Sequence, residues 1–247
     1  HPVVTEAPPF RRAKTRYCTR MRSFFDSRRL ALIATTASLG FLTSTPLALA
    51  KSGEPVSIGN QTLLNQGLVG VGRLPSNLKD KYGETFGSFS AFTFKPGSWK
   101  RNADGSYAGV IIAQPDRGYN VTGTTNYRAR YNEIAVAFSP APQGASTQNQ
   151  VGLTLTDTIL YTEADGTPLT SLDPTPAGVG TRAGFPALPQ AFNGRLSLDP
   201  EGIVANADGS LWVSDEYGPY IFKFTADGKL VSAIRPPEAI VPKRNGA

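Results

Sequence analysis

The stretch Glu201–Ile234 constrains the fold most, because it reads as four short strands joined by tight turns. Apolar and β-branched residues dominate each run, and Asp-Gly pairs, which tolerate positive φ, mark two of the turns. Four antiparallel strands in so short a segment have the size of one blade of a β-propeller. Because a single blade cannot bury both of its faces, we expect neighbouring blades. The predicted strands are Gly202–Ala205, Leu211–Ser214, Tyr220–Phe224 and Leu230–Ile234.

An earlier part of the chain repeats this plan. The letters Asn-Ala-Asp-Gly-Ser occur at 102–106 and again at 206–210, and an apolar strand that ends in an acidic residue near a glycine follows each copy. The distance between the copies fits two blades of roughly 50 residues each. Further strands are predicted at Phe89–Phe94 and Asn132–Phe138, and Leu153–Tyr161 reads as a strand pair.

The fold class that follows is all-β. Amphipathic helical periodicity is hard to find after Lys51, whereas short β-rich runs and turn signals alternate to the end. We therefore predict that residues 51–247 form a partial β-propeller of about four blades, the N-terminal part of a larger propeller. A signal-peptide helix is expected to precede it.

The first fifty residues read as a targeting segment. From Met21 the chain has a basic start, an apolar run over Leu30–Leu42 and a small-x-small pattern that ends at Ala50, which is typical of a secretory signal peptide. We assign residues 21–50 to this signal, with cleavage after Ala50, and residues 1–20 to an upstream extension that is disordered or artefactual. An uncleaved anchor is the alternative, although the apolar run is too short to span a bilayer stably.

The net charge of +6 belongs to this leader. Residues 1–50 hold eight of the 25 Lys and Arg and two of the 19 Asp and Glu, so the rest of the chain carries equal numbers of bases and acids. With no basic block there, a nucleic-acid partner is not expected. The expected location is extracellular, or periplasmic in a bacterium. Sequons at Asn60 and Asn120 are predicted sites of N-glycosylation in a secreted eukaryotic protein.

The residue types that are missing restrict the chemistry. The single His, Cys and Met all lie within the first 50 residues. Residues 51–247 therefore contain no Ser-His-Asp triad, no Cys-His pair, no disulfide and no zinc site with His or thiolate ligands. Chemistry in this part must come from carboxylates, Arg, Lys, Tyr, hydroxyl groups or a hard cation.

Acidic side chains stand at matching strand ends of the two predicted blades. Asp199 and Glu201 lead into one predicted strand, Asp215 and Glu216 follow the next, and Asp116 follows the equivalent strand of the earlier blade. Oxygen ligands suit Ca²⁺ or Mg²⁺, and clustered carboxylates are costly unless a cation neutralises them. We expect a divalent metal, Ca²⁺ first, on Asp116, Asp199, Glu201 and Asp215, with catalytic roles for Glu201, Asp215 and Glu216. The alternative is that these acids cap turns or are solvated.

Basic side chains follow the acids closely. Arg117 comes directly after Asp116, and Arg130 lies two residues before the predicted strand Asn132–Phe138. Arg holds phosphate or carboxylate groups with two parallel hydrogen bonds, so we predict that Arg117 and Arg130 bind a substrate anion. Ordinary ion pairs are the alternative.

Several segments around these residues match one known family. The strongest match is Leu198–Ile203 followed by Leu211–Pro219, and the shorter ones are Phe86–Ser90, Asp116–Gly118 and Ala129–Tyr131. In them the chain resembles the phytase-like family of secreted propeller-type proteins, described as "esterase-like activity of phytase". The resemblance implies a β-propeller and a hydrolase of phosphoesters or carboxylic esters. Members of that family continue through several more blades, so we expect this chain to be an N-terminal fragment.

Two functions from different classes remain. The first is a secreted phytase-like hydrolase that uses a carboxylate-bound divalent metal on a small-molecule ester or phosphoester. The second is a non-catalytic secreted β-propeller that binds a ligand or a surface, in which the same acids hold structural Ca²⁺ or cap turns.

Overall fold

The computed structural model describes residues 53–175 and 179–241. Over these ranges the chain is all-β, with thirteen strands, one short 3-10 helix (η1, Glu238–Ile240) and no α-helix. No helix in the described ranges is long and apolar enough to cross a membrane. The predicted extension (residues 1–20), the signal peptide (residues 21–50) and its cleavage site at Ala50 lie outside the described residues.

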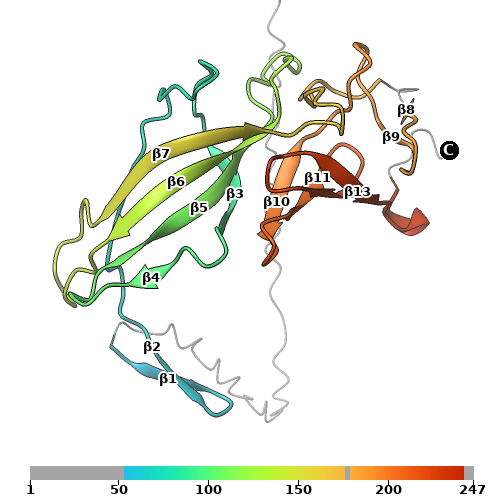
Figure 1. Cartoon of the computed structure of the whole chain (residues 1–247). Helices are drawn as coiled ribbons and strands as arrows, with labels where there is room; N and C mark the ends of the chain where they lie inside the picture. Colours follow the sequence, from blue (N-terminus) through green and yellow to red (C-terminus); the bar gives the residue numbers. More distant parts are fainter. Residues whose placement is uncertain (1–52, 176–178, 242–247) are drawn as a thin grey trace, which may run out of the picture. The chain divides into compact units, whose positions relative to one another are not determined.

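The larger sheet has five antiparallel strands in the order β3-β5-β6-β7, with β4 paired to β5 (Figure 1). The predicted strand at Phe89–Phe94 is confirmed, and Asn132–Phe138 lies within β6. The predicted strand pair at Leu153–Tyr161 is wrong, because all of these residues except Tyr161 belong to one long strand that pairs with β6 along its whole length. The bounds are β3 (Phe89–Phe94), β4 (Lys100–Arg101), β5 (Tyr107–Pro115), β6 (Arg130–Phe138) and β7 (Val151–Leu160).

The second sheet is the four-stranded meander that the sequence predicts, in the order β10-β11-β12-β13. Side chains alternate along its strands: Leu211 and Val213 are buried while Trp212 between them is partly exposed. This period of two gives the sheet one apolar face, which is the reason that these runs form strands. The bounds are β10 (Pro200–Ala205), β11 (Leu211–Asp215), β12 (Ile221–Phe224) and β13 (Leu230–Ile234).

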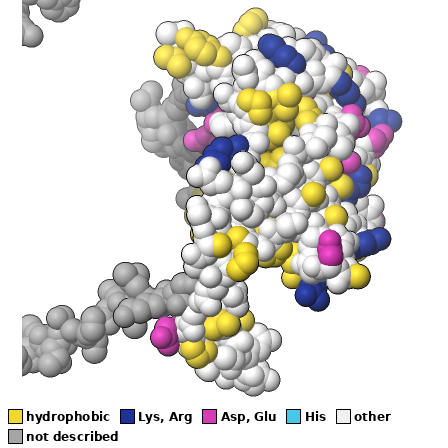
Figure 2. All heavy atoms as spheres, turned by 90° about the vertical axis from the view of Figure 1, so that its left-hand side faces the viewer, with side chains coloured by type: hydrophobic (Ala, Val, Ile, Leu, Met, Phe, Trp, Pro, Cys, Tyr) yellow, Lys and Arg dark blue, Asp and Glu magenta, His cyan; other side chains and the backbone are white. Residues whose placement is uncertain are grey.

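Two small hairpins complete the described strands. The strands β1 (Pro55–Ile58) and β2 (Gln61–Leu64) form one, and β8 (Val179–Gly180) and β9 (Leu188–Pro189) form the other. The hairpin of β1 and β2 is exposed along its whole length. On the face drawn in Figure 2, basic and acidic side chains are interspersed among apolar ones and form no single basic surface.

The repeated five letters mark a structural repeat. In both turns, at 102–106 and 206–210, the Asn N–H donates to the Ser carbonyl at 2.8 Å, and the Asn side-chain amide donates to the Ser hydroxyl at 2.9 Å. Gly105 and Gly209 have φ of +85° and +84°, which glycine adopts without strain. The two sheets are therefore built around the same turn.

The described residues do not form the predicted number of about four blades. Residues 53–175 and 179–241 contain two sheets of blade size, and these are neighbours because β10 contacts both β3 and β5. Loops over 116–129 and 161–199, with the small β8–β9 hairpin, account for the distance between the repeated turns. No sheet closes on itself in this part of the chain, so what the structure establishes is an all-β fold of several antiparallel sheets.

A shared core joins the two large sheets. Tyr161, at the end of β7, is fully buried and lies 4.4 Å from the ring of Phe224, measured between ring centroids. Its hydroxyl donates to the side-chain carbonyl of Gln114 in β5 at 2.9 Å. The core extends under the loop that precedes β10, where Leu196 and Leu198 are buried on either side of Ser197. This packing holds the start of β10 beside the end of β5.

Candidate functional site

Three carboxylates meet where the two large sheets touch. Asp116 follows β5 directly, Asp199 immediately precedes β10, and Glu201 lies in β10. One oxygen from each lies within 4.8 Å of the others, so the group could hold a metal ion. Asp116 comes from the larger sheet and the other two from the second sheet, which means that the packing of β10 on β3 and β5 assembles the site.

A β-bulge directs Glu201. In the ladder between β10 and β11, Pro200 pairs with Asp215 and Gly202 pairs with Ser214, which leaves Glu201 without an opposite residue. Such a bulge bends the strand and re-aims the extra side chain. The ladder between β3 and β5 has a register shift in the matching place, between Phe89 and Ala91.

Asp199 is the buried member of the group. Its backbone is anchored on both sides, because its N–H donates to Oδ1 of Asp215 at 2.9 Å and its carbonyl accepts from the N–H of Glu216 at 3.0 Å. Its side chain is fully buried, and Nη1 of Arg117 lies 2.9 Å from Oδ2. This ion pair lacks the angles of a hydrogen bond, and neither carboxylate oxygen accepts one from the described residues. A buried carboxylate with unused lone pairs next to two other carboxylates fits the donor set of a hard cation.

The electrostatics of the group follow from this burial. Loss of solvent raises the pKa of Asp199 to about 7; Arg117 opposes the rise, while Asp116, Glu201 and Glu216 add to it. Burial also raises the pKa of Glu201, and the charges of Asp116 and Glu216 act in the same direction. Without a cation the ionised group is therefore unfavourable, and a bound cation would relieve the repulsion.

In the structure, Asp215 supports the backbone of Asp199. Its carboxylate is buried and accepts from the N–H of Asp199 through Oδ1 and from the N–H of Gly218 through Oδ2, at 3.0 Å for the latter. Burial raises its pKa to about 7 in spite of these backbone donors. Because Asp215 is not among the three carboxylates that lie within 4.8 Å of one another, and both of its oxygens accept backbone N–H groups, we treat it as the residue that positions Asp199. Glu216 is exposed and lies within hydrogen-bonding reach of Glu201.

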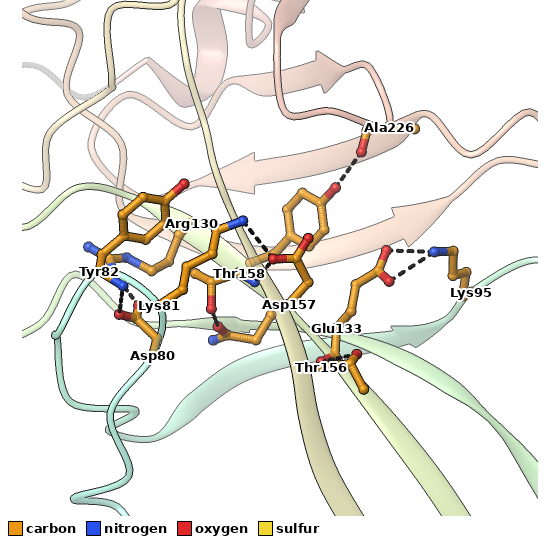
Figure 3. A network of polar contacts seen from close by, with 12 residues as sticks. Asp80, Lys81, Tyr82, Lys95, Arg130, Glu133, Thr156, Asp157, Thr158 and Ala226 are labelled. Atoms are coloured by element: carbon orange, nitrogen blue, oxygen red, sulfur yellow. Dashed lines mark hydrogen bonds and ion pairs between the residues drawn. The ribbon is translucent and has the colours of Figure 1, made fainter.

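The two arginines predicted to bind substrate occupy different environments. Arg117 stays at the site, paired with Asp199 and with its guanidinium 5.6 Å from the ring centroid of Tyr217. Arg130 is fully buried and forms an ion pair with Asp80, while its Nε donates to the carbonyl of Arg128 at 2.8 Å (Figure 3). Since its charge is neutralised inside the protein, we do not assign Arg130 to substrate binding.

The ion pair of Arg130 with Asp80 makes a stability prediction. Replacing Asp80 by Asn should lower the free energy of unfolding by about 3–5 kcal/mol, because it leaves a buried guanidinium without a counter-charge. The matched control is Asp157→Asn, which breaks an ion pair with Lys81 whose two side chains are 46% and 47% exposed. An exposed pair contributes about 0–1 kcal/mol, so the control should cost little more than that. Urea unfolding of both variants measures the difference, and equal losses would contradict a buried ion pair.

The raised pKa values make a prediction for the metal-free protein. Asp199 and Asp215 titrate near pH 7 when folded and near pH 4 when unfolded, so between these values the folded state binds the extra protons. The free energy of unfolding should therefore fall as the pH rises from about 4 to about 7, by an amount on the order of 4 kcal/mol per group, and then level off. In Asp199→Asn the fall should be about half as large. Urea unfolding in chelator at several pH values measures this, and a rise of stability over the range would contradict it.

A cavity of about 420 Å³ adjoins the site. Asp116 lines the cavity and belongs to the carboxylate group, so the cavity leads to the proposed ligands. Glu84 and Tyr127 also line it. The sequence did not point to these two, because only the fold brings their loops beside β5. Asn120 lies at the cavity and is exposed, as is Asn60 in the turn between β1 and β2, so both predicted glycosylation sites are accessible.

Comparisons with known proteins agree with this description. The family model "Phytase-like: Esterase-like activity of phytase" matches residues 84–247, which include both large sheets and the carboxylate site. An uncharacterized secreted protein of Arthroderma benhamiae is 42% identical over 236 residues, which cover 87% of this chain and 45% of that protein. The chain therefore spans less than half the length of this relative, and the relative's name confirms the prediction of a secreted protein. No solved structure matches the chain. The match over well more than half of its residues shows that the chain belongs to the phytase-like family.

Proposed function

We propose that this protein is a secreted hydrolase of esters or phosphoesters whose reaction centre is the group of Asp116, Asp199 and Glu201. The observation that carries the proposal is the convergence of these three carboxylates within 4.8 Å at the edge of a cavity. A fully buried Asp199 without hydrogen bonds to its carboxylate gives the group the donor set for Ca²⁺ or a similar cation. Membership of the phytase-like family supports a hydrolase.

The three carboxylates have different proposed roles, according to how exposed each of them is. Asp116 and Asp199 are the less exposed members and would hold the cation. The carboxylate of Asp215 keeps Asp199 in place by accepting a hydrogen bond from the backbone N–H of Asp199. A bound divalent cation supplies polarisation of the ester oxygen and a lower pKa for water. Glu201 is exposed, and its raised pKa suits a group that takes a proton from the attacking water. The guanidinium of Arg117 pairs with Asp199 and offsets part of the negative charge of the neighbouring carboxylates.

The chemistry is balanced by water alone. The water oxygen forms a bond to the acyl carbon or to phosphorus, and the bond to the leaving alcohol breaks. The proton taken by Glu201 ends on the alcohol, so Glu201 returns to its starting form and no other reactant is consumed.

The test is hydrolysis by the purified secreted protein with Ca²⁺ present. 4-Nitrophenyl acetate and 4-nitrophenyl phosphate report the two bond types, and release of 4-nitrophenol from either one above the rate of the Glu201→Gln variant supports the proposal. No enzymatic release from either would contradict it. The non-catalytic secreted module, in which the same carboxylates hold structural Ca²⁺, would then be the better account.

A further inference from the structure

The lining of the cavity beside the carboxylates is negatively charged. Its described lining contains two carboxylates and otherwise neutral groups, with no Lys or Arg. The neutral part offers phenol, hydroxyl and amide groups, which suit hydrogen bonding to an uncharged molecule. The polar members that matter here are Glu84, Asp116, Tyr119, Asn120, Thr125 and Tyr127.

The neighbouring basic side chains are already engaged. Arg117 is 2.9 Å from Asp199, and Arg130 is paired with Asp80. The guanidinium of Arg128 lies 4.8 Å from the ring centroid of Tyr82. None of the three lines the cavity. A substrate that enters by this cavity therefore meets carboxylates and no free cationic side chain among the described lining residues.

The charge balance extends this argument to the reaction centre. Asp116, Asp199 and Glu201 have carboxylate oxygens within 4.8 Å of one another, the N–H of Glu216 donates to the carbonyl of Asp199, and Arg117 is the base paired with the Asp199 side chain. A single divalent cation together with Arg117 does not outweigh four carboxylates. The loaded site would thus have no net positive charge with which to attract a polyanion.

From these observations we infer that the substrate is an uncharged carboxylic ester with hydrogen-bonding groups, and not a phosphate-rich molecule. The inference rests on the proposed function, and it narrows the two bond types to one. Water adds to the acyl carbon, the acyl C–O bond breaks, and the products are a carboxylic acid and a neutral alcohol. Recognition of several phosphates needs clustered Arg or Lys, which this cavity lacks in its described lining.

Esters that differ by one charge test the inference. 4-Nitrophenyl acetate and 4-nitrophenyl hemisuccinate share the reacting bond, and the second adds one carboxylate. The spontaneous hydrolysis of the hemisuccinate, in which that carboxylate attacks the acyl carbon, is subtracted from its rate. At low salt, kcat/KM should be at least about tenfold larger for the acetate, and the gap should narrow as NaCl screens the repulsion. Glu84→Gln removes one charge from the lining, so at low salt it should also reduce the difference in kcat/KM between the two esters. The ratio of the two rates is the readout, so a general loss of activity in the variant does not affect it.

A binding measurement gives a readout apart from turnover. Inorganic phosphate, titrated calorimetrically into the protein with dilute Ca²⁺, should give no saturable heat. Preference for the hemisuccinate or for 4-nitrophenyl phosphate, or saturable phosphate binding, would overturn the inference while leaving the proposed hydrolase intact. If none of the esters is hydrolysed, the proposed function falls and this inference falls with it.

Discussion

Glu201→Gln is expected to lower kcat/KM for ester hydrolysis by about 100-fold or more, while the melting temperature stays within about 2 °C of the wild type. The amide has the shape of the carboxylate but cannot take a proton from water. The substitution should not disturb the fold, because Glu201 is exposed and lies in a β-bulge, where no residue of β11 stands opposite it. Turnover assays and thermal unfolding of the same samples measure both effects.

The control for this variant is Glu54→Gln, the same substitution at an exposed glutamate just before β1. It should leave kcat/KM and the melting temperature unchanged. Full activity of Glu201→Gln would exclude Glu201 as the proton acceptor. A large fall of its melting temperature together with a loss of bound metal would favour the structural-calcium alternative.

Chelation by EDTA is expected to abolish hydrolysis and to lower the melting temperature, and added Ca²⁺ should restore both. The physical reason is that removal of the cation leaves Asp116, Asp199 and Glu201 facing one another, with only the charge of Arg117, among the described residues, paired with Asp199. A ligand present at 100 times its dissociation constant stabilises the folded state by about 2.7 kcal/mol, so the fall should be readily measurable.

The Asp199→Asn variant provides the control for chelation. With one buried charge removed, its repulsion without metal is smaller, so EDTA should lower its melting temperature less than that of the wild type. Activity that survives complete chelation would show that the reaction does not depend on the metal. A melting temperature that does not respond to EDTA in either protein would contradict a metal at these carboxylates.

Much of the local structure could be predicted because its signals are local. Alternating runs such as Phe89–Phe94 and the four strands of Glu201–Ile234 carry the period of a half-buried sheet, and the structure has all of these strands, with ends that differ by at most two residues from the prediction. The repeated turn at 102–106 and 206–210 carries its own hydrogen bonds in both copies. Acids placed after equivalent strands also led to Asp116, Asp199 and Glu201, which the fold brings together.

The remaining differences come from contacts between residues far apart in the chain. Arg130 reads as a free base until Asp80, fifty positions earlier, appears beside it. The sequence predicts Asp215 as a metal ligand, and it could not show that the folded loop places two backbone N–H groups on its carboxylate. The distance between the repeated turns suggested two blades of equal size, but the interval holds three long strands of one sheet together with long loops. Loop length carries little information about the number of sheets.

The most direct test of the account is a calorimetric titration of Ca²⁺ into the chelator-treated protein at neutral pH. We expect saturable binding in the wild type, the same binding in Glu54→Gln, and affinity at least about tenfold weaker in Asp116→Asn and in Asp199→Asn, because each loses one charged ligand. Equal Ca²⁺ affinity in all four proteins, or no binding in any of them, would contradict a metal centre at Asp116, Asp199 and Glu201.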